Sequence, residues 1–211
     1  MTSGDGKEHH EDMSLNPEVL VPAPARIGPV TDFRGTLLGS SLQYVRDHGL
    51  EARYFELLPR EHHDAIRNMI PQSWLPVEVA FAHYTVMNQL VPNQAQMRAN
   101  GRTVADKVQG TYIATLIQGL RASGAVSPTR VLQRLPSIWE RVTRGGGAAV
   151  YKLGPKDARI DVLEMSLCAI DYYRFGLEGL IEASLALTAR SVRVTHKKTS
   201  DRTASYFISW V

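Results

Sequence analysis

The sequence predicts an α+β fold in which an N-terminal helical half precedes a ββαββ antiparallel sheet unit. Two observations support this prediction. Up to Arg144, apolar residues recur every three or four positions, as they do in amphipathic helices. After the run Gly145–Gly147 the period falls to two, as in half-buried strands, and a single further helical pattern follows. The glycine run is therefore the expected boundary between a helical half (31–144) and a sheet half (148–211) of one domain (31–211).

The helical half is preceded by residues 1–30, whose Gly, Glu, His, Pro and Ala content predicts a disordered tail. Thr31 or Asp32 can cap the first helix, which is expected to end at Gly49. A loop is expected over Pro92–Asn100, and Pro136 is expected to kink or split the last helix. Further helical patterns cover 50–58, 59–69, 74–87, 101–123 and 128–142.

The sheet half begins with two strands, over 148–153 and 159–165, joined by a turn of Gly, Pro, Lys and Asp. A packed helix follows Cys168, and its Gly176 and Gly179 predict that another element approaches it closely. The last hairpin runs from 191 to the end of the chain. Its final strand places four residues on one face, namely Ala204, Tyr206, Ile208 and Trp210.

Composition narrows the functional classes. The 211 residues are 44% hydrophobic, and 24 basic against 21 acidic residues leave a net charge of only +3. This charge does not favour nucleic acid as a partner. A single cysteine excludes an internal disulfide and a cysteine-based zinc cluster. No apolar run approaches the length of a membrane span, and the first residues contain no apolar signal core. We therefore expect a soluble, cytoplasmic protein that does not enter the membrane. Its oligomeric state stays open between a monomer and a homodimer.

Candidate ligand-binding residues are mainly aromatic. An apolar cavity between the two halves would draw on Tyr84, Tyr112, Trp139, Tyr151 and Tyr173, because such pockets are mostly apolar with a few polar groups. Ordinary core packing explains each of these side chains equally well.

Arg174, at the start of the glycine-bearing helix, is the main polar candidate. It would bind a ligand carboxylate or phosphate, helped by the positive helix terminus. The alternative for Arg174 is an ion pair with Asp171 or Glu178. His83 is a candidate haem ligand, against the more frequent role of a core histidine.

Five strings of the sequence are distinctive: Phe33–Leu38, Ser73–Glu78, Pro136–Trp139, Tyr172–Gly179 and Tyr206–Trp210. They resemble an uncharacterised family that is expanded into paralogues in myxobacteria. The sheet half of that family is in turn similar to 4-vinyl reductase-type domains and, more distantly, to haem–nitric-oxide-binding sensor domains. The resemblance implies a ligand site between the helical half and the sheet.

The chain departs from two features of these related domains. It lacks the Tyr-x-Ser-x-Arg string that holds haem propionates, and its last turn, Thr199–Arg202, contains no cysteine. We therefore expect no cofactor, haem included.

The functional expectation is a non-enzymatic small-molecule-binding or sensor module, because no paired carboxylates, catalytic triad or metal set is recognisable. The alternative is a protein-interaction or scaffold module that binds a partner protein through a basic C-terminal hairpin and holds no ligand. The hairpin's basic residues are Arg190, Arg193, His196, Lys197, Lys198 and Arg202.

Overall fold

The computed structural model describes residues 17–108 and 127–211. Its helices before the glycine run are α1 (Gly35–Asp47), α2 (Glu51–Leu57), α3 (His63–Arg67), α4 (Val77–Leu90), α5 (Gln94–Val108), α7 (Pro128–Leu132) and α8 (Leu135–Val142), with a 3₁₀ turn η1 (Arg60–His62). The sheet unit contains β5 (Gly147–Gly154), β6 (Asp157–Leu163), η3 (Ser166–Ala169), α9 (Asp171–Leu185), β7 (Val192–Ser200) and β8 (Thr203–Trp210). The predicted α+β class and the ββαββ order are confirmed.

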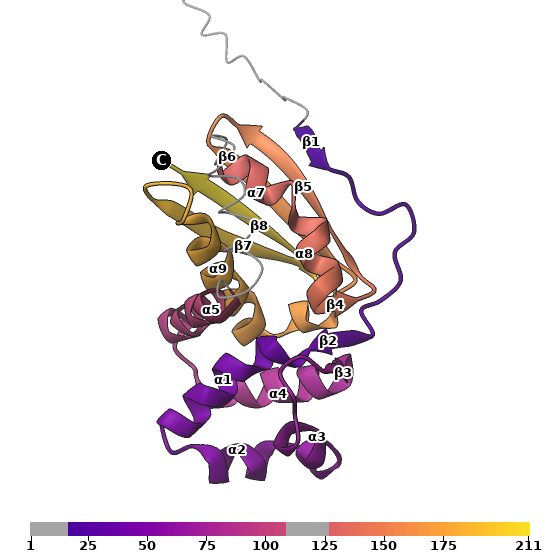
Figure 1. Cartoon of the computed structure of the whole chain (residues 1–211), viewed down its shortest axis with the longest axis vertical. Helices are drawn as coiled ribbons and strands as arrows, with labels where there is room; N and C mark the ends of the chain where they lie inside the picture. Colours follow the sequence, from indigo (N-terminus) through magenta and orange to yellow (C-terminus); the bar gives the residue numbers. More distant parts are fainter. Residues whose placement is uncertain (1–16, 109–126) are drawn as a thin grey trace, which may run out of the picture.

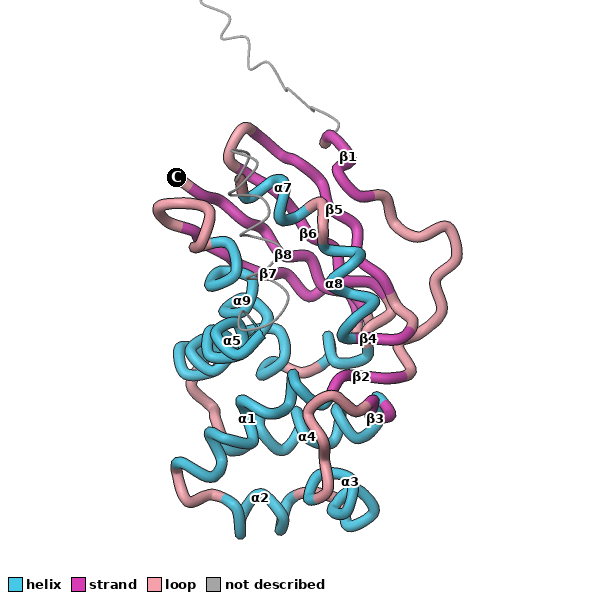
Figure 2. Tube along the Cα trace, in the orientation of Figure 1, coloured by secondary structure: helices cyan, strands magenta, loops and turns pink. Residues whose placement is uncertain are grey.

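Four further strands are short: β1 (Glu18–Val21), β2 (Asp32–Arg34), β3 (Trp74–Pro76) and β4 (Thr143–Arg144). The main sheet has the order β1-β5-β6-β8-β7, and all its neighbours are antiparallel. A small sheet, β3-β2-β4, lies where the two halves meet (Figure 2). Figure 1 shows α1 to α4 gathered at one end of the molecule and α7 and α8 lying over one face of the main sheet.

The strand register decides which face of the main sheet is buried. Val150, Ile160 and Tyr206 are paired across three neighbouring strands, and all three are buried. Ala204 and Ile208 are buried on the same face, as predicted, whereas Trp210 is only half-buried near the end of the sheet. Side chains on this inner face meet the helices.

The prediction of a disordered tail is wrong for the part of it that lies nearest the domain. Glu18–Val21 pairs with β5 at the edge of the main sheet, and both Val21 and Val30 are buried. A strand this short depends on a partner more than a hundred residues away, so local composition does not reveal it. Residues 1–16 lie outside the described residues.

Two other segments differ from the sequence-based expectation. Trp74–Pro76, expected to begin a helix, forms β3 because it pairs with β2. The expected loop over 92–100 is largely helical, since α5 begins at Gln94. Asn93 accounts for this start: its side-chain oxygen accepts hydrogen bonds from the backbone N–H groups of Ala95 and Gln96, as an N-cap does.

Serine and proline shape the last helices, and Pro136 acts as predicted. Ser127 caps α7 by accepting from the backbone N–H of Arg130, and Pro128 occupies the first turn. Pro136 lies in the first turn of α8, so the pattern is split into two helices.

The close approach predicted for α9 is present, the neighbour is α5, and the glycines that allow it are Gly179 of α9 and Gly101 of α5. A Cβ on Gly179 would lie 2.0 Å from the backbone oxygen of Arg98, and one on Gly101 would lie 1.9 Å from that of Gly176. No real Cβ atom tolerates such distances, so α5 and α9 pack backbone against backbone.

Candidate functional site

An apolar cavity of about 170 Å³ lies between the helices and the inner face of the main sheet. Its volume is close to that of an engineered cavity of about 150 Å³ that binds benzene. The described residues that line it are Phe33, Leu37, Ser41, Tyr84, Asn100, Gly101, Val104, Val131, Leu132, Leu135, Ile138, Trp139, Val142, Thr143, Ile160, Val162, Tyr172, Tyr173, Gly176, Leu177, Leu180, Ile181, Ser184 and Leu185.

Helix α9 supplies one wall of the cavity because its apolar stripe faces inward. Leu177, Leu180 and Ile181, spaced three and four apart, line the cavity and remain only half-buried. The sheet supplies the facing wall through Ile160 and Val162 of β6. No Lys, Arg, Asp, Glu, His or Cys is among the described lining residues. The site therefore suits an uncharged, largely apolar molecule.

Polar lining side chains gather where α1, α5 and α9 meet. Asn100 of α5 donates from Nδ2 to the Tyr172 hydroxyl of α9 (3.1 Å) and accepts at Oδ1 from Gln96 Nε2 (3.0 Å). Burial raises the pKa of Tyr172 to about 12, although the bond from Asn100 lowers it, so the hydroxyl stays neutral. Ser41 of α1 completes this group, which we call the polar end of the cavity: Ser41, Asn100 and Tyr172.

Ser41 also contacts His83, which is fully buried behind the polar end. His83 Nε2 lies 2.7 Å from Ser41 Oγ, and Nδ1 lies 2.8 Å from the Tyr54 hydroxyl. Ser41 donates its single hydrogen to the backbone oxygen of Leu38, so Nε2–H donates to Ser41 and Tyr54 donates to Nδ1. In this tautomer Nε2 cannot accept a proton from Ser41. The trio therefore joins α1, α2 and α4 structurally and is not an activated nucleophile.

The surroundings of His83 and of the cavity also decide whether the site can hold haem. Both ring nitrogens of His83 are occupied, His83 does not line the cavity, and burial lowers its pKa to about 3. The described lining contains no histidine or cysteine to bind iron, and burial raises the pKa of Tyr84, Tyr172 and Tyr173, which disfavours the tyrosinate form that iron binds. It also contains no arginine or lysine to hold propionates. The described residues therefore do not fit haem.

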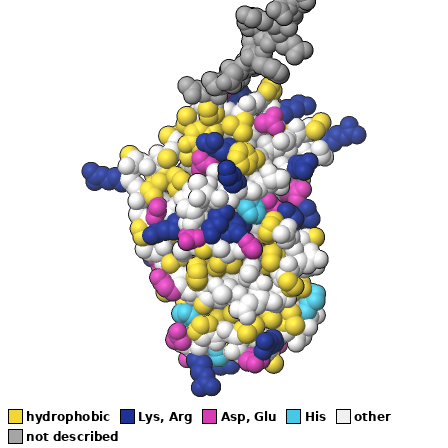
Figure 3. Space-filling view, turned by 180° about the vertical axis from the view of Figure 1, so that it is seen from behind, with side chains coloured by type: hydrophobic (Ala, Val, Ile, Leu, Met, Phe, Trp, Pro, Cys, Tyr) yellow, Lys and Arg dark blue, Asp and Glu magenta, His cyan; other side chains and the backbone are white. Residues whose placement is uncertain are grey.

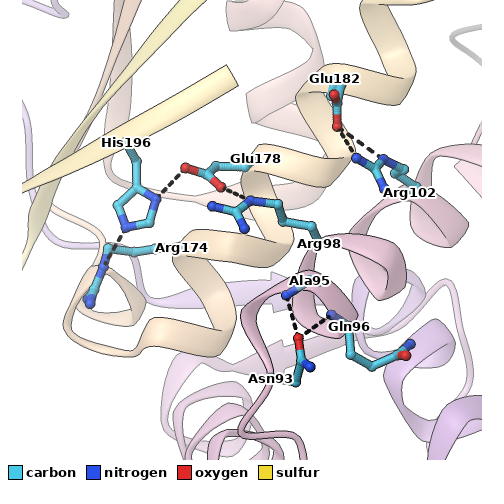
Figure 4. A network of polar contacts seen from close by, with 9 residues as sticks. All are labelled: Asn93, Ala95, Gln96, Arg98, Arg102, Arg174, Glu178, Glu182 and His196. Carbon is cyan, nitrogen blue, oxygen red and sulfur yellow. Dashed lines mark hydrogen bonds and ion pairs between the residues drawn. The ribbon is translucent and has the colours of Figure 1, made fainter. Parts of the chain in front are cut away.

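A charged network lies beside the cavity, between α5, α9 and β7 (Figure 4). Glu178 accepts from Arg98 on one side and from His196 Nδ1 (2.7 Å) on the other. On its other ring nitrogen, His196 Nε2 lies 3.3 Å from Arg174 Nε. Desolvation raises the pKa of Glu178, but the bonds from His196 and Arg98 outweigh it and hold the pKa below its ordinary value.

The structure places the predicted site residues in three groups. Tyr84, Trp139 and Tyr173 line the cavity. Tyr112 lies outside the described residues. Tyr151 and Arg174 do not line the cavity, for separate physical reasons.

Tyr151 pairs with Arg159 on β6, and Arg159 in turn pairs with Phe207 on β8. This register puts Tyr151 on the outer face of the sheet, where the Arg159 guanidinium lies 4.4 Å from the centre of its ring. Arg174 is buried and paired with Asp171, and it donates to the backbone oxygen of Cys168. The ion pair that was the alternative for Arg174 is therefore present.

Sequence reasoning missed Asn100 and Ser41 at the cavity. Asn100 fell in the expected loop, and Ser41 was not among the candidate residues. The signal available was the Asn93 cap, which would have extended α5 back to include Asn100.

The part of the chain that the structure describes contains neither a metal centre nor a membrane-spanning helix. No group of three or more His, Cys, Asp or Glu side chains is placed to hold a metal ion. Within the same residues, no helix has both the length and the apolar character of a membrane span.

Several solved structures of H-NOX proteins have a similar fold. An Fe(II) unliganded H-NOX protein from K. algicida is 11% identical, with a TM-score of 0.62 over 84% of this chain and 96% of that one. An H-NOX protein from S. oneidensis in the Fe(II)NO ligation state is 13% identical, with a TM-score of 0.52 over 84% and 99%. A structure from work on haem distortion in the H-NOX family is 12% identical, with a TM-score of 0.56 over 84% and 94%. The expected similarity to haem–nitric-oxide-binding domains is confirmed for the fold.

Comparison with curated proteins gives no match. The family model described as "Protein of unknown function (DUF2378)" matches residues 72–211. This range includes α4, α5, α9 and the main sheet apart from β1, and thus most of the cavity wall. Since the match covers more than half of the sequence, the chain belongs to this family of unknown function.

Proposed function

We propose that the chain is a non-enzymatic small-molecule-binding or sensor module that holds an uncharged, largely apolar organic ligand in the cavity between α9 and the main sheet. The observation that carries the proposal is the cavity itself, about 170 Å³ in volume with no charged side chain among its described lining residues. The fold supports it, since the H-NOX proteins are similar in architecture. The ligand proposed here is organic because the described lining does not fit haem.

The wider setting is also proposed. We place the module in the cytoplasm, in agreement with its single cysteine, and we relate its sheet half to the 4-vinyl reductase-type domains of the resemblance above, with an origin in myxobacteria. A homodimer stays an open part of this proposal.

The alternative is a scaffold that binds a protein through the basic hairpin. It has less support because three of the six basic side chains already have partners. His196 binds Glu178, Lys198 pairs with Asp201, and Arg202 pairs with Glu164. Figure 3, which views the molecule from behind, shows basic and acidic side chains interspersed rather than gathered into one patch.

The test is calorimetric titration of the full chain with benzene. Burying six carbon atoms at about 0.8 kcal/mol each gives about 5 kcal/mol, so we expect a Kd of roughly a few hundred micromolar. Leu180→Trp, which adds bulk inside the cavity, should abolish binding. Leu153→Trp makes the same change at a side chain that is 41% exposed and outside the cavity lining, and it should leave binding intact. No binding to the parent, or equal binding by both variants, would refute the proposal.

A further inference from the structure

We infer that the cavity selects ligands carrying an uncharged hydrogen-bond acceptor, a ketone or ester carbonyl on an apolar body, and that the side-chain amide of Asn100 donates to that carbonyl. This inference rests on the proposed function and names the class of ligand for the same cavity.

The first step is the free hydrogen-bonding capacity of Asn100. A carboxamide nitrogen carries two hydrogens. Within the described chain, Asn100 Nδ2 makes one hydrogen bond, to the Tyr172 hydroxyl, while Oδ1 accepts from Gln96. Asn100 is 7% exposed and lines the cavity, so its second N–H is removed from bulk water. A buried donor without an acceptor lowers stability, and a ligand carbonyl in the cavity would remove that cost.

The second step is that other polar groups of the lining already have partners in the protein. Tyr84 donates to the backbone oxygen of Leu37, Trp139 to that of Gly145, and Thr143 to that of Trp139. Ser41 is committed to Leu38 and His83.

Two hydroxyl groups, those of Tyr173 and Ser184, also line the cavity. A hydroxyl both donates and accepts, so it does not distinguish a ligand acceptor from a ligand donor. The Asn100 amide nitrogen only donates, so its second N–H is satisfied by an acceptor alone.

The third step excludes charged ligands. With no cation among the described lining residues, a carboxylate or phosphate would enter without a counter-charge, and burying an unpaired ion is far costlier than burying a carbonyl. A carbonyl accepts one hydrogen bond and needs no proton transfer, which matches the neutral Tyr172 and the amide of Asn100. The polar end therefore favours ligands that carry a neutral hydrogen-bond acceptor.

The experiment uses two probes of matched shape, cyclohexanone and methylenecyclohexane, which differ only in C=O against C=CH₂. Their Kd values are measured by calorimetry for the full parent chain and for Asn100→Leu, which keeps the side-chain volume. We expect the alkene-to-ketone ratio of Kd values to fall about three- to tenfold in Asn100→Leu, the worth of one net hydrogen bond. Asn68→Leu, the same substitution at an exposed side chain outside the cavity lining, is the control, and with it the ketone should keep its advantage.

A second measurement covers the case in which Asn100→Leu fails to fold. In the ¹⁵N-labelled parent, the side-chain amide protons of Asn100 should shift downfield with cyclohexanone and not with methylenecyclohexane. If the parent binds neither probe, the proposed function itself fails. If it binds both, with a ratio unchanged in Asn100→Leu or with no ketone-specific amide shift, the cavity binds molecules but the inference about Asn100 is wrong.

Discussion

Replacing Gly179 with alanine adds one methyl group at the closest contact between α5 and α9. The new Cβ would lie 2.0 Å from the Arg98 oxygen and 2.9 Å from its carbonyl carbon, both backbone atoms that cannot rotate away. The helices must separate, and such overpacking costs about 1–3 kcal/mol or more. Helix propensity opposes this by about 1 kcal/mol in favour of alanine. We expect a net loss of about 1–2 kcal/mol in the free energy of unfolding.

Gly176→Ala is the matched control on the same helix. Its Cβ would meet only the Met97 backbone oxygen at 3.9 Å, an ordinary contact, so propensity should dominate and the variant should be slightly more stable than the parent. Urea melts monitored by circular dichroism measure both variants. With a slope of about 2 kcal/mol per molar urea, the Gly179→Ala midpoint should fall by about 0.5–1 M. If Gly179→Ala is as stable as Gly176→Ala, the close packing of α5 on α9 is refuted.

Three further predictions concern burial. Below pH 6.5 His83 is protonated in the unfolded chain but stays neutral in the folded chain, where its pKa is about 3. The free energy of unfolding should therefore fall as the pH is lowered, by up to about 1.4 kcal/mol per pH unit. Urea melts of His83→Gln between pH 6.5 and 5 should lose this pH dependence, and an unchanged pH dependence would contradict the prediction. Glu178→Gln, at a carboxylate that is 3% exposed, should lower the free energy of unfolding by about 2–4 kcal/mol. Glu182→Gln, at the more exposed ion pair with Arg102, should lower it by under about 1 kcal/mol. Equal urea midpoints for the two variants would argue against the buried network. Val21→Asp should lower the melting temperature by several degrees because Val21 is buried in β1. Val19→Asp, at a side chain that is 55% exposed, should leave the melting temperature unchanged. Equal melting temperatures of the two variants would contradict the packing of β1 on the domain.

Much of the fold follows from local pattern. The period-two strands, the Ser127 cap and the split at Pro136 depend on near neighbours in sequence, and each is observed. The glycines of α9 likewise indicate close packing, although they do not name the partner helix.

The remaining features depend on distant partners. β1 exists only because β5 pairs with it. The trio of Ser41, Tyr54 and His83 joins side chains 29 and 42 residues apart, which no periodicity links.

The candidate site divides in the same way. Tyr84, Trp139 and Tyr173 were predicted for a cavity between the halves, and they lie along it. Tyr151 was misplaced because the face on which a strand residue lies is known only with the register. Its pairing with Arg159, which pairs in turn with Phe207, fixes it on the outer side. Asn100 required the correct start of α5. Aromatic content thus locates a cavity, whereas its polar end depends on which helices meet.

Intermolecular nuclear Overhauser effects from benzene to the protein's methyl groups test the binding cavity most directly. With benzene in saturating amounts and the full chain labelled with ¹³C in its methyl groups, we predict contacts to Leu180, Ile181 and Val162, which line the cavity. Val19 and Leu153, exposed on the main sheet away from the cavity, should show none. Contacts confined to exposed methyl groups, or no contacts at saturation, would contradict a ligand site between α9 and the sheet.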